Sequence, residues 1–140
     1  MNSDIMKDNV IIDTSVWIDY FQKVNSDFSN QVDKLLTQAN IYVPKIIIAE
    51  LIQGAHSEKE VALIKEFLEA FRIIGEEEET WFKAGSLSYT LKKKGKTVNL
   101  TDCYISIIAK EQNCAILTLD KHFKEIEKAG GIELITPPAL

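Results

Sequence analysis

The chain has 140 residues, 46% of them hydrophobic and 26% charged, a composition typical of a folded domain rather than of a disordered, collagen-like or disulfide-rich chain. Acidic residues outnumber basic ones by 21 to 16, so the net charge of -5 gives no general attraction to nucleic acid. The chain has only two cysteines, no secretion signal at residues 1–8 and no apolar run of the roughly 18 residues that a bilayer requires. We therefore expect a cytoplasmic protein without a membrane segment.

In the first half of the chain, short apolar runs alternate with amphipathic segments. The β-branched runs at residues 10–12 and 41–43 predict two buried strands. Helices are expected over residues 14–21, over a piece that ends near residue 36 after a polar stretch at 25–30, and over 46–54. Thr14 and Ser15 are placed to cap the first of these helices, and Pro44 suits the entry to the last.

The second half continues the alternation of helices and strands. Strands are expected at residues 71–74, 115–119 and 132–135, and helices over 58–70, 77–94, 101–112 and 121–128, with Gly95 ending the longest helix. Short apolar strands that alternate with helices indicate a parallel sheet covered on both faces. With no internal repeat and no linker, we expect residues 1–140 to form a single domain.

Three aspartates stand at predicted strand ends and helix starts. Asp13 and Asp120 directly follow the strands predicted at 10–12 and 115–119, and Asp102 opens the helix between them. Because ligands of open parallel sheets gather beyond the carboxyl ends of the strands, these acids are candidates for a shared site. Each one taken singly is equally well explained as a helix cap or as a complement to a helix dipole.

Glu50 lies in a short predicted helix that is apolar on nearly every side. No Lys or Arg stands three or four positions away to neutralise it. Because an unpaired buried carboxylate costs several kcal/mol, it needs a cation, a raised pKa or an exposed stripe that the pattern hides. Carboxylates gathered at one sheet edge would repel one another unless a positive ion lay between them. Mg²⁺ or Mn²⁺ suits such oxygen ligands and also binds phosphate, which points to metal-assisted phosphodiester hydrolysis.

At these residues the sequence resembles the PIN-domain ribonucleases, and most closely the VapC-type toxins of bacterial and archaeal toxin–antitoxin pairs. Four acidic motifs carry the resemblance, in the order of the family and across nearly the whole chain. A lone D-T-S is a weak signal, whereas four acidic motifs with these neighbours are a specific one. The matching segments are Ile12–Ile18, Ala49–Gly54, Leu100–Ile105 and Leu117–Phe123.

The resemblance implies an α/β fold, a three-layer α/β/α sandwich with a central, mostly parallel sheet. It also implies a Mg²⁺- or Mn²⁺-dependent endoribonuclease whose acidic pocket is formed by Asp13, Glu50, Asp102 and Asp120. The first three carry over as metal ligands, and Asp120 as a ligand that acts directly, through water or on a second ion. Similar proteins are usually homodimers that cut RNA and are inhibited by a VapB-type antitoxin whose tail enters the active site.

The resemblance leaves the roles of several residues open. Ser15 and Thr118 match hydroxyl positions that support the pocket, and a helix cap and a strand end explain them equally well. Many relatives carry another acid where this chain has His122, which weakens the case for a second ion. We assign His122 a surface or supporting role, because the histidines have no zinc-like spacing with the cysteines.

The basic cluster at 92–96 is a candidate RNA contact or simply a solvated helix end. Two other functions stay open. One is a PIN-like binding module that has lost its activity, which the presence of all four acids argues against. The other is a phosphoacceptor signalling domain, which needs an aspartate after a central strand, whereas the third predicted strand here ends at Ile74-Gly75. The sequence does not reveal the RNA target or the number of ions.

Overall fold

One parallel sheet of five strands organises the chain in the computed structural model, which describes residues 8–135. The strand order is β3-β2-β1-β4-β5, so that β1 is central and β3 and β5 are the edges. In the register of the sheet, Ile11 lies opposite Tyr42 on one side and Ile116 on the other. The strands are β1 (Asn9–Ile12), β2 (Asn40–Pro44), β3 (Arg72–Ile74), β4 (Ala115–Leu117) and β5 (Leu134–Ile135).

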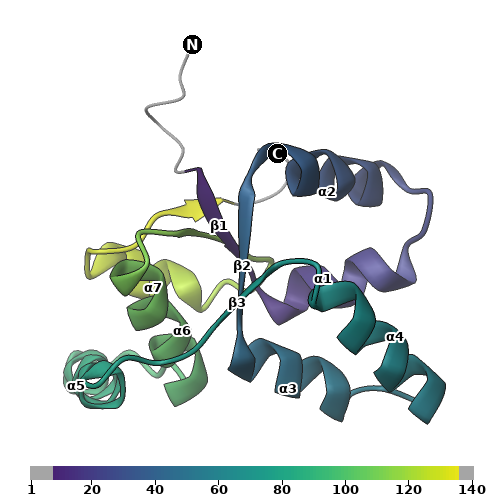
Figure 1. The fold of residues 1–140 in the computed structure, drawn as a ribbon. Coiled ribbons are helices and arrows are strands. Elements are labelled where there is room, and N and C mark those ends of the chain that lie inside the picture. The colour runs from purple at the N-terminus through teal and green to yellow at the C-terminus, as the bar shows by residue number, and fades with distance from the viewer. Residues whose placement is uncertain (1–7, 136–140) are drawn as a thin grey trace.

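Helices cover both faces of the sheet. They are α1 (Thr14–Gln22), α2 (Asp27–Gln38), α3 (Lys45–Gln53), α4 (Glu58–Leu68), α5 (Thr80–Lys93), α6 (Leu100–Glu111) and α7 (Phe123–Lys128). Figure 1 shows α5, α6 and α7 on one side of the sheet and α1, α2 and α4 on the other. This arrangement confirms the expected three-layer α/β/α sandwich, with a sheet that is entirely parallel. Across residues 8–135, every helix is too short or too polar to traverse a bilayer.

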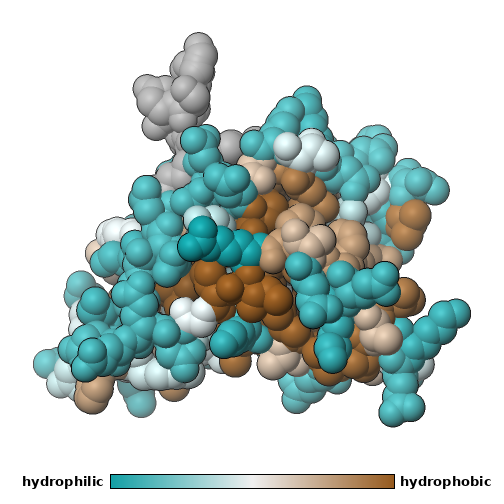
Figure 2. All heavy atoms as spheres, in the orientation of Figure 1, coloured by the Kyte–Doolittle hydropathy of each residue, from teal (hydrophilic) through white to brown (hydrophobic). Residues whose placement is uncertain are grey.

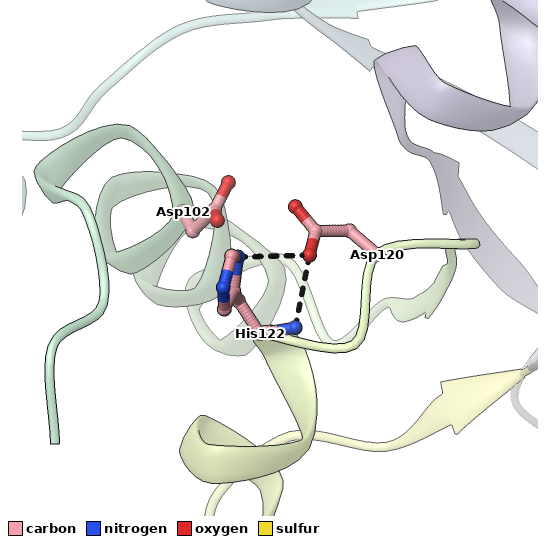
Figure 3. A group of neighbouring side chains, drawn as sticks. All are labelled: Asp102, Asp120 and His122. Atoms are coloured by element: carbon pink, nitrogen blue, oxygen red, sulfur yellow. Dashed lines mark hydrogen bonds and ion pairs between the residues drawn. The ribbon is translucent and has the colours of Figure 1, made fainter.

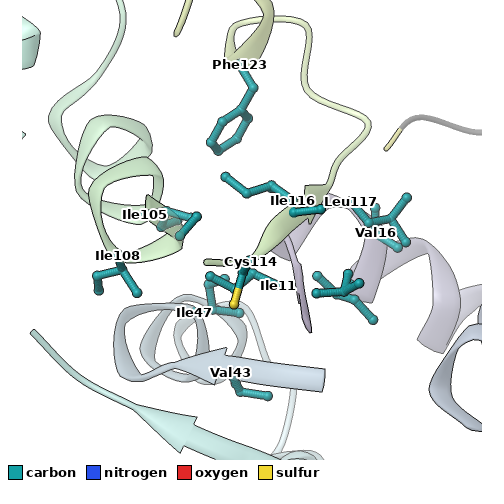
Figure 4. Close-up of a cluster of buried hydrophobic side chains, with 14 of the residues drawn as sticks. Ile11, Val16, Val43, Ile47, Ile105, Ile108, Cys114, Ile116, Leu117 and Phe123 are labelled. Carbon is teal, nitrogen blue, oxygen red and sulfur yellow. The ribbon is translucent and has the colours of Figure 1, made fainter. Parts of the chain in front are cut away.

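The core lies on both faces of the central strands. The side chains of Val10, Ile11 and Ile12 are at most 1% exposed, as expected for a strand that carries helices on each face. Figure 4 shows Ile105 and Ile108 of α6 packing toward the sheet, with Ile47 of α3 among the same cluster of side chains. Both cysteines, Cys103 and Cys114, are also buried in this core.

Two helices begin at places that the apolar pattern does not predict. Helix α2 begins at Asp27, inside the polar stretch expected to separate two helices, because Ser26 and Ser29 form a capping box with two hydrogen bonds of 3.0 Å. Helix α5 begins at Thr80, three residues later than expected. The Thr80 hydroxyl accepts a hydrogen bond from the Glu77 backbone and donates one to Glu111, which holds residues 77–79 in a turn.

The end of α5 follows the expected glycine signal. Gly95 adopts a left-handed conformation with φ of 78°, which costs an L-residue about 1–2 kcal/mol. The Lys96 backbone N–H donates to the Leu91 carbonyl, and the Gly95 N–H donates to the Lys92 carbonyl. These two bonds form a Schellman motif, which satisfies the last carbonyls of the helix.

The segment after β4 leaves the sheet earlier than expected. The strand ends at Leu117 rather than at residue 119, because the backbone N–H groups of Leu119 and Asp120 donate to the hydroxyls of Ser15 and Thr118. These side-chain acceptors take the place of the backbone carbonyls that would continue the hydrogen bonds of the sheet. Helix α7 correspondingly begins at Phe123 instead of residue 121. The final strand, β5, starts two residues later than expected. Pro137-Pro138, which follow it in the sequence, lie outside the described residues.

Candidate functional site

The candidate site lies where the chain reverses the direction in which it crosses the sheet. Strands β1 and β4 are neighbours, but β1 leads to β2 over one face and β4 leads to β5 over the other. Such switch points leave a crevice beyond the carboxyl ends of the two strands. Asp13 follows β1 directly, and its backbone N–H donates to the Leu117 carbonyl at the end of β4 at 2.9 Å. The sheet register therefore places Asp13 at this crevice.

Two hydroxyl groups hold the Asp13 carboxylate. Its Oδ2 atom accepts hydrogen bonds from Ser15 Oγ at 2.8 Å and from Thr118 Oγ1 at 2.9 Å. Asp13 occupies the N-cap position of α1, but neither it nor the hydroxyls of Thr14 and Ser15 cap the helix. The expected capping role is therefore wrong for all three residues, because their side chains bind within the crevice instead. The two hydrogen bonds to Asp13 confirm that the hydroxyls of Ser15 and Thr118 support this carboxylate.

Glu50 reaches the crevice from α3. Its Oε1 atom accepts a hydrogen bond from Thr14 Oγ1 at 2.7 Å, a contact between α3 and α1 that the sequence did not indicate. The expectation that α3 is apolar on nearly every side needs correction. Lys45, Ala49 and Gln53 form an exposed stripe, and Glu50 is half-buried beside it. The side chain is thus partly hydrated, and its burial alone does not call for a cation.

Asp102 is the carboxylate with the most unfavourable environment. It is the third residue of α6, and Asn99 caps this helix by accepting a hydrogen bond from the Asp102 backbone N–H at 2.8 Å. The Asp102 side chain is therefore not needed as a cap. The residue is only 7% exposed, and its Oδ2 atom is buried without a hydrogen-bond partner. A buried, unsatisfied carboxylate oxygen is costly unless another group completes its contacts.

The other three acids add to this cost. Burial, the largest cause, and then the charges of Asp120, Asp13 and Glu50, in decreasing order, together raise the pKa of Asp102 to about 7, whereas His122 lowers it. All four acids singled out in the sequence thus form one group, in which Asp13, Glu50 and Asp120 each lie within electrostatic reach of Asp102. We refer to these four residues as the acidic cup.

Asp120 and His122 close one side of the acidic cup. Asp120 Oδ1 accepts a hydrogen bond from the His122 backbone N–H at 2.9 Å and lies 3.1 Å from His122 Nδ1. Figure 3 shows the imidazole ring beside the carboxylate of Asp102, with one ring nitrogen directed toward Asp120. One potential ligand atom from each of these three residues lies within 4.8 Å of the others. Sequence reasoning missed this position of His122, and the one available signal was its place two residues after Asp120.

These donors suit a divalent cation. Carboxylate oxygens are the ligands that Mg²⁺ and Mn²⁺ prefer, and a cation would both complete the contacts of Asp102 and offset the mutual repulsion of the acids. Asp13, Glu50, Asp102 and Asp120 are the residues that could hold it. Asp19, by contrast, pairs with Lys23 at 3.1 Å on the surface of α1.

Comparisons with known proteins find a matching family and a similar sequence. The family model described as the PIN domain matches residues 10–129. The Ribonuclease VapC1 of Methanocaldococcus jannaschii is 30% identical over 122 residues, which cover 86% of this chain and 83% of that protein.

Solved structures share the fold at lower identity. One is the crystal structure of VapBC2 from Rickettsia felis bound to a DNA fragment from the VapBC2 promoter. It has a TM-score of 0.75 at 20% identity, and the match covers 91% of this chain and 98% of that one. VapBC-5 from Mycobacterium tuberculosis, a member of the VapBC family of toxin–antitoxin systems, has a TM-score of 0.65 at 19% identity, with 93% and 99% covered.

Proposed function

Since the chain belongs to the PIN domain family and, within it, to the VapC ribonucleases, we propose that it is a metal-dependent endoribonuclease that hydrolyses RNA phosphodiester bonds as the toxin of a toxin–antitoxin pair. The observation that carries the proposal is the acidic cup. In it the buried Asp102 oxygen has no hydrogen-bond partner, while three further carboxylates raise the pKa of the same residue. Such an arrangement is unfavourable in the protein alone and favourable around a cation.

In this proposal Asp13, Glu50, Asp102 and Asp120 hold Mg²⁺ or Mn²⁺. A divalent cation in the cup supplies positive charge against the phosphodiester oxygens and makes water a stronger nucleophile. The carboxylates of the chain provide the negative charge that retains the ion and accept protons from water. The half-buried Asp120 and Glu50 face solvent more than the other two and are therefore the better placed to exchange protons.

Neighbouring groups keep these carboxylates oriented. Thr118 and Ser15 fix Asp13, Thr14 fixes Glu50, and the His122 backbone fixes Asp120. Groups that orient metal ligands in this way typically change metal affinity 10- to 100-fold when they are removed. The contacts therefore support a preorganised site rather than four acids that repel one another into solvent.

RNA cleavage tests the proposal. We expect the purified chain to cut RNA only with Mg²⁺ or Mn²⁺ and to stop when a chelator is added. Asp13→Asn and Glu50→Gln should each lower the rate by about 100-fold or more, the loss typical of removing one electrostatic contact to the transition state. Asp19→Asn is the matched control, because Asp19 pairs with Lys23 outside the cup.

Two results would count against the nuclease. Intact RNA under all these conditions would refute it, and metal binding by the cup without cleavage would favour the inactive binding module. The sequence argument against the phosphoacceptor alternative was the lack of an aspartate after β3. That argument fails, because β3 is an edge strand and the central strand β1 is followed by Asp13. The family match is what disfavours it, and labelling by a small phosphodonor checks it.

We also propose a VapB-type antitoxin as the partner. An apolar groove of about 760 Å³ between α1 and α4 supports this, with Phe21, Leu63 and Phe67 in its lining. Figure 2 shows hydrophobic side chains exposed on the face that carries α4 and β3. A second hollow shares Phe21 with the groove and includes Glu50, so a segment bound in the groove can continue to the acidic cup.

Co-purification with a candidate VapB-type protein tests the partner. Phe67→Ser should abolish capture, and Phe82→Ser should not, because Phe82 is an exposed phenylalanine on α5 outside the groove. Equal capture by both variants would contradict this assignment.

The homodimer and the cytoplasmic location stay predictions. Sedimentation of the purified chain checks whether it forms a homodimer.

A further inference from the structure

His122 brings a nitrogen donor to a cup otherwise made of carboxylate oxygens. Its ring lies beside Asp102, and Nδ1 stands 3.1 Å from Asp120 Oδ1. The backbone N–H of His122 binds the same oxygen at 2.9 Å, so residues 120–122 form a tight turn that returns the ring toward the cup. The imidazole is therefore oriented by Asp120 although its side chain is 66% exposed.

We infer that His122 is a metal ligand of this chain and gives the cup a preference for Mn²⁺ over Mg²⁺. The inference rests on the proposed function and concerns the ion that the nuclease uses. Mg²⁺ favours ligand sets made of oxygen atoms, whereas first-row transition ions also accept imidazole nitrogen. An acid at position 122 would leave the cup with oxygen ligands alone, and histidine changes that set.

Two observations carry the inference. The first is the spacing, because the candidate ligand atoms of Asp102, Asp120 and His122 lie within 4.8 Å of one another. Ligands about 2.1 Å from one ion are at most about 4.2 Å apart, so a small rotation of the exposed His122 side chain would complete the site. The second is the Asp102 Oδ2 atom, which is buried and has no hydrogen-bond partner. A cation shared with His122 would supply the contact that this oxygen lacks.

A simpler role for His122 is that of an ion-pair partner for Asp120. In that role the ring would offset the negative charge of the cup but would not touch the ion. Charge and coordination have different signatures, because only a bound ring places its nitrogen next to a paramagnetic Mn²⁺. A direct measurement of that coupling therefore separates the two roles.

The experiment uses the full chain without metal, titrated with Mn²⁺ and followed by electron paramagnetic resonance, with Mg²⁺ as the competitor. The variants are His122→Asp, which supplies an oxygen ligand, and His122→Asn, which removes the ring. His56→Asn is the matched control, because His56 lies against Glu60 at the start of α4 and not in the cup. The exposed position of His122 favours intact folding of the variants, which urea unfolding verifies.

We expect Mn²⁺ bound to the unmodified chain to show the nitrogen modulation of a coordinated imidazole in pulsed spectra. The signal should vanish in both His122 variants and persist in His56→Asn. The ratio of Mg²⁺ to Mn²⁺ dissociation constants should fall about tenfold or more in His122→Asp, the lower end of the effects seen for groups that support metal sites. The absence of the signal in the unmodified chain, its persistence in His122→Asp, or an unchanged ratio would each overturn the inference.

Cleavage assays on the same samples distinguish this inference from the proposed function. A chain that shows the nitrogen signal but leaves RNA intact refutes the nuclease and upholds His122 as a ligand. A chain that cuts RNA without the signal upholds the nuclease and refutes the role of His122. The absence of any Mn²⁺ binding overturns both.

Discussion

Asp102 should make the metal-free protein less stable as the pH rises. Its pKa is raised from 3.8 to about 7 in the folded protein, first by burial and then by the charges of Asp120, Asp13 and Glu50. Between about pH 4 and pH 7, the folded chain thus keeps a proton that the unfolded chain has lost. Because the folded state binds more protons, the free energy of unfolding falls across this window and levels off above it.

The substitution Asp102→Asn isolates this effect. Each unit of pKa shift corresponds to about 1.4 kcal/mol, so a shift of about 3 units corresponds to up to about 4 kcal/mol above pH 7. The neutral amide does not carry this penalty. We therefore expect the variant to be more stable than the unmodified chain by up to about 4 kcal/mol at pH 8, and by little at pH 4, where the unfolded chain has only begun to lose the proton that the folded chain keeps.

Urea unfolding in the presence of a chelator at pH 4, 6 and 8 measures the difference. Glu78→Gln is the control, because it removes the same charge from an exposed position and should change the free energy of unfolding by less than about 0.5 kcal/mol. Parallel pH profiles for the unmodified chain and Asp102→Asn would refute the reasoning, as would a variant that is less stable at pH 8. Added Mn²⁺ should stabilise the unmodified chain more than the variant, since a ligand stabilises only the state that binds it.

Three further substitutions test contacts described above. Thr118→Val removes the hydroxyl that binds Asp13 at 2.9 Å and should cost about 1–3 kcal/mol in urea unfolding, together with a 10- to 100-fold loss of Mn²⁺ affinity in a titration. Gly95→Ala should lower the free energy of unfolding by about 1–2 kcal/mol through backbone strain alone, because a Cβ there meets no atom within 4 Å; an unchanged midpoint would contradict this. Tyr104→Phe removes the 2.8 Å hydrogen bond to Glu76 and should cost about 0.5–1.5 kcal/mol at neutral pH, and a more stable variant would argue against the bond.

The sequence predicts the fold well where apolar patterning decides the structure. The β-branched run at 10–12 is a buried central strand, and its alternation with helices gives the layered architecture. The pattern fails where side-chain hydrogen bonds decide, since the capping box at Ser26 starts a helix inside a polar stretch and the Ser15 and Thr118 hydroxyls end β4 early. Apolar periodicity carries no information on these bonds.

The candidate site is predictable in its parts rather than in its geometry. The predicted strands already place Asp13 and Asp120 at one sheet edge, and the predicted helices single out Asp102 and Glu50. The family resemblance then joins all four acids in one pocket. The contact between Thr14 and Glu50 depends on how α1 and α3 cross, and the position of His122 depends on the turn after β4. Neither is encoded in a local pattern, because each arises from tertiary packing.

The hydrogen bond between Thr118 and Asp13 joins residues 105 positions apart. Residues 9–74 supply β1, β2 and β3, so the ribosome releases one side of the sheet well before β4 is made. A growing polypeptide that ends before residue 115 carries Asp13, Glu50 and Asp102 but has neither Asp120 nor the strand that brings Thr118 to Asp13. The complete set of carboxylates therefore exists only after translation has passed residue 120.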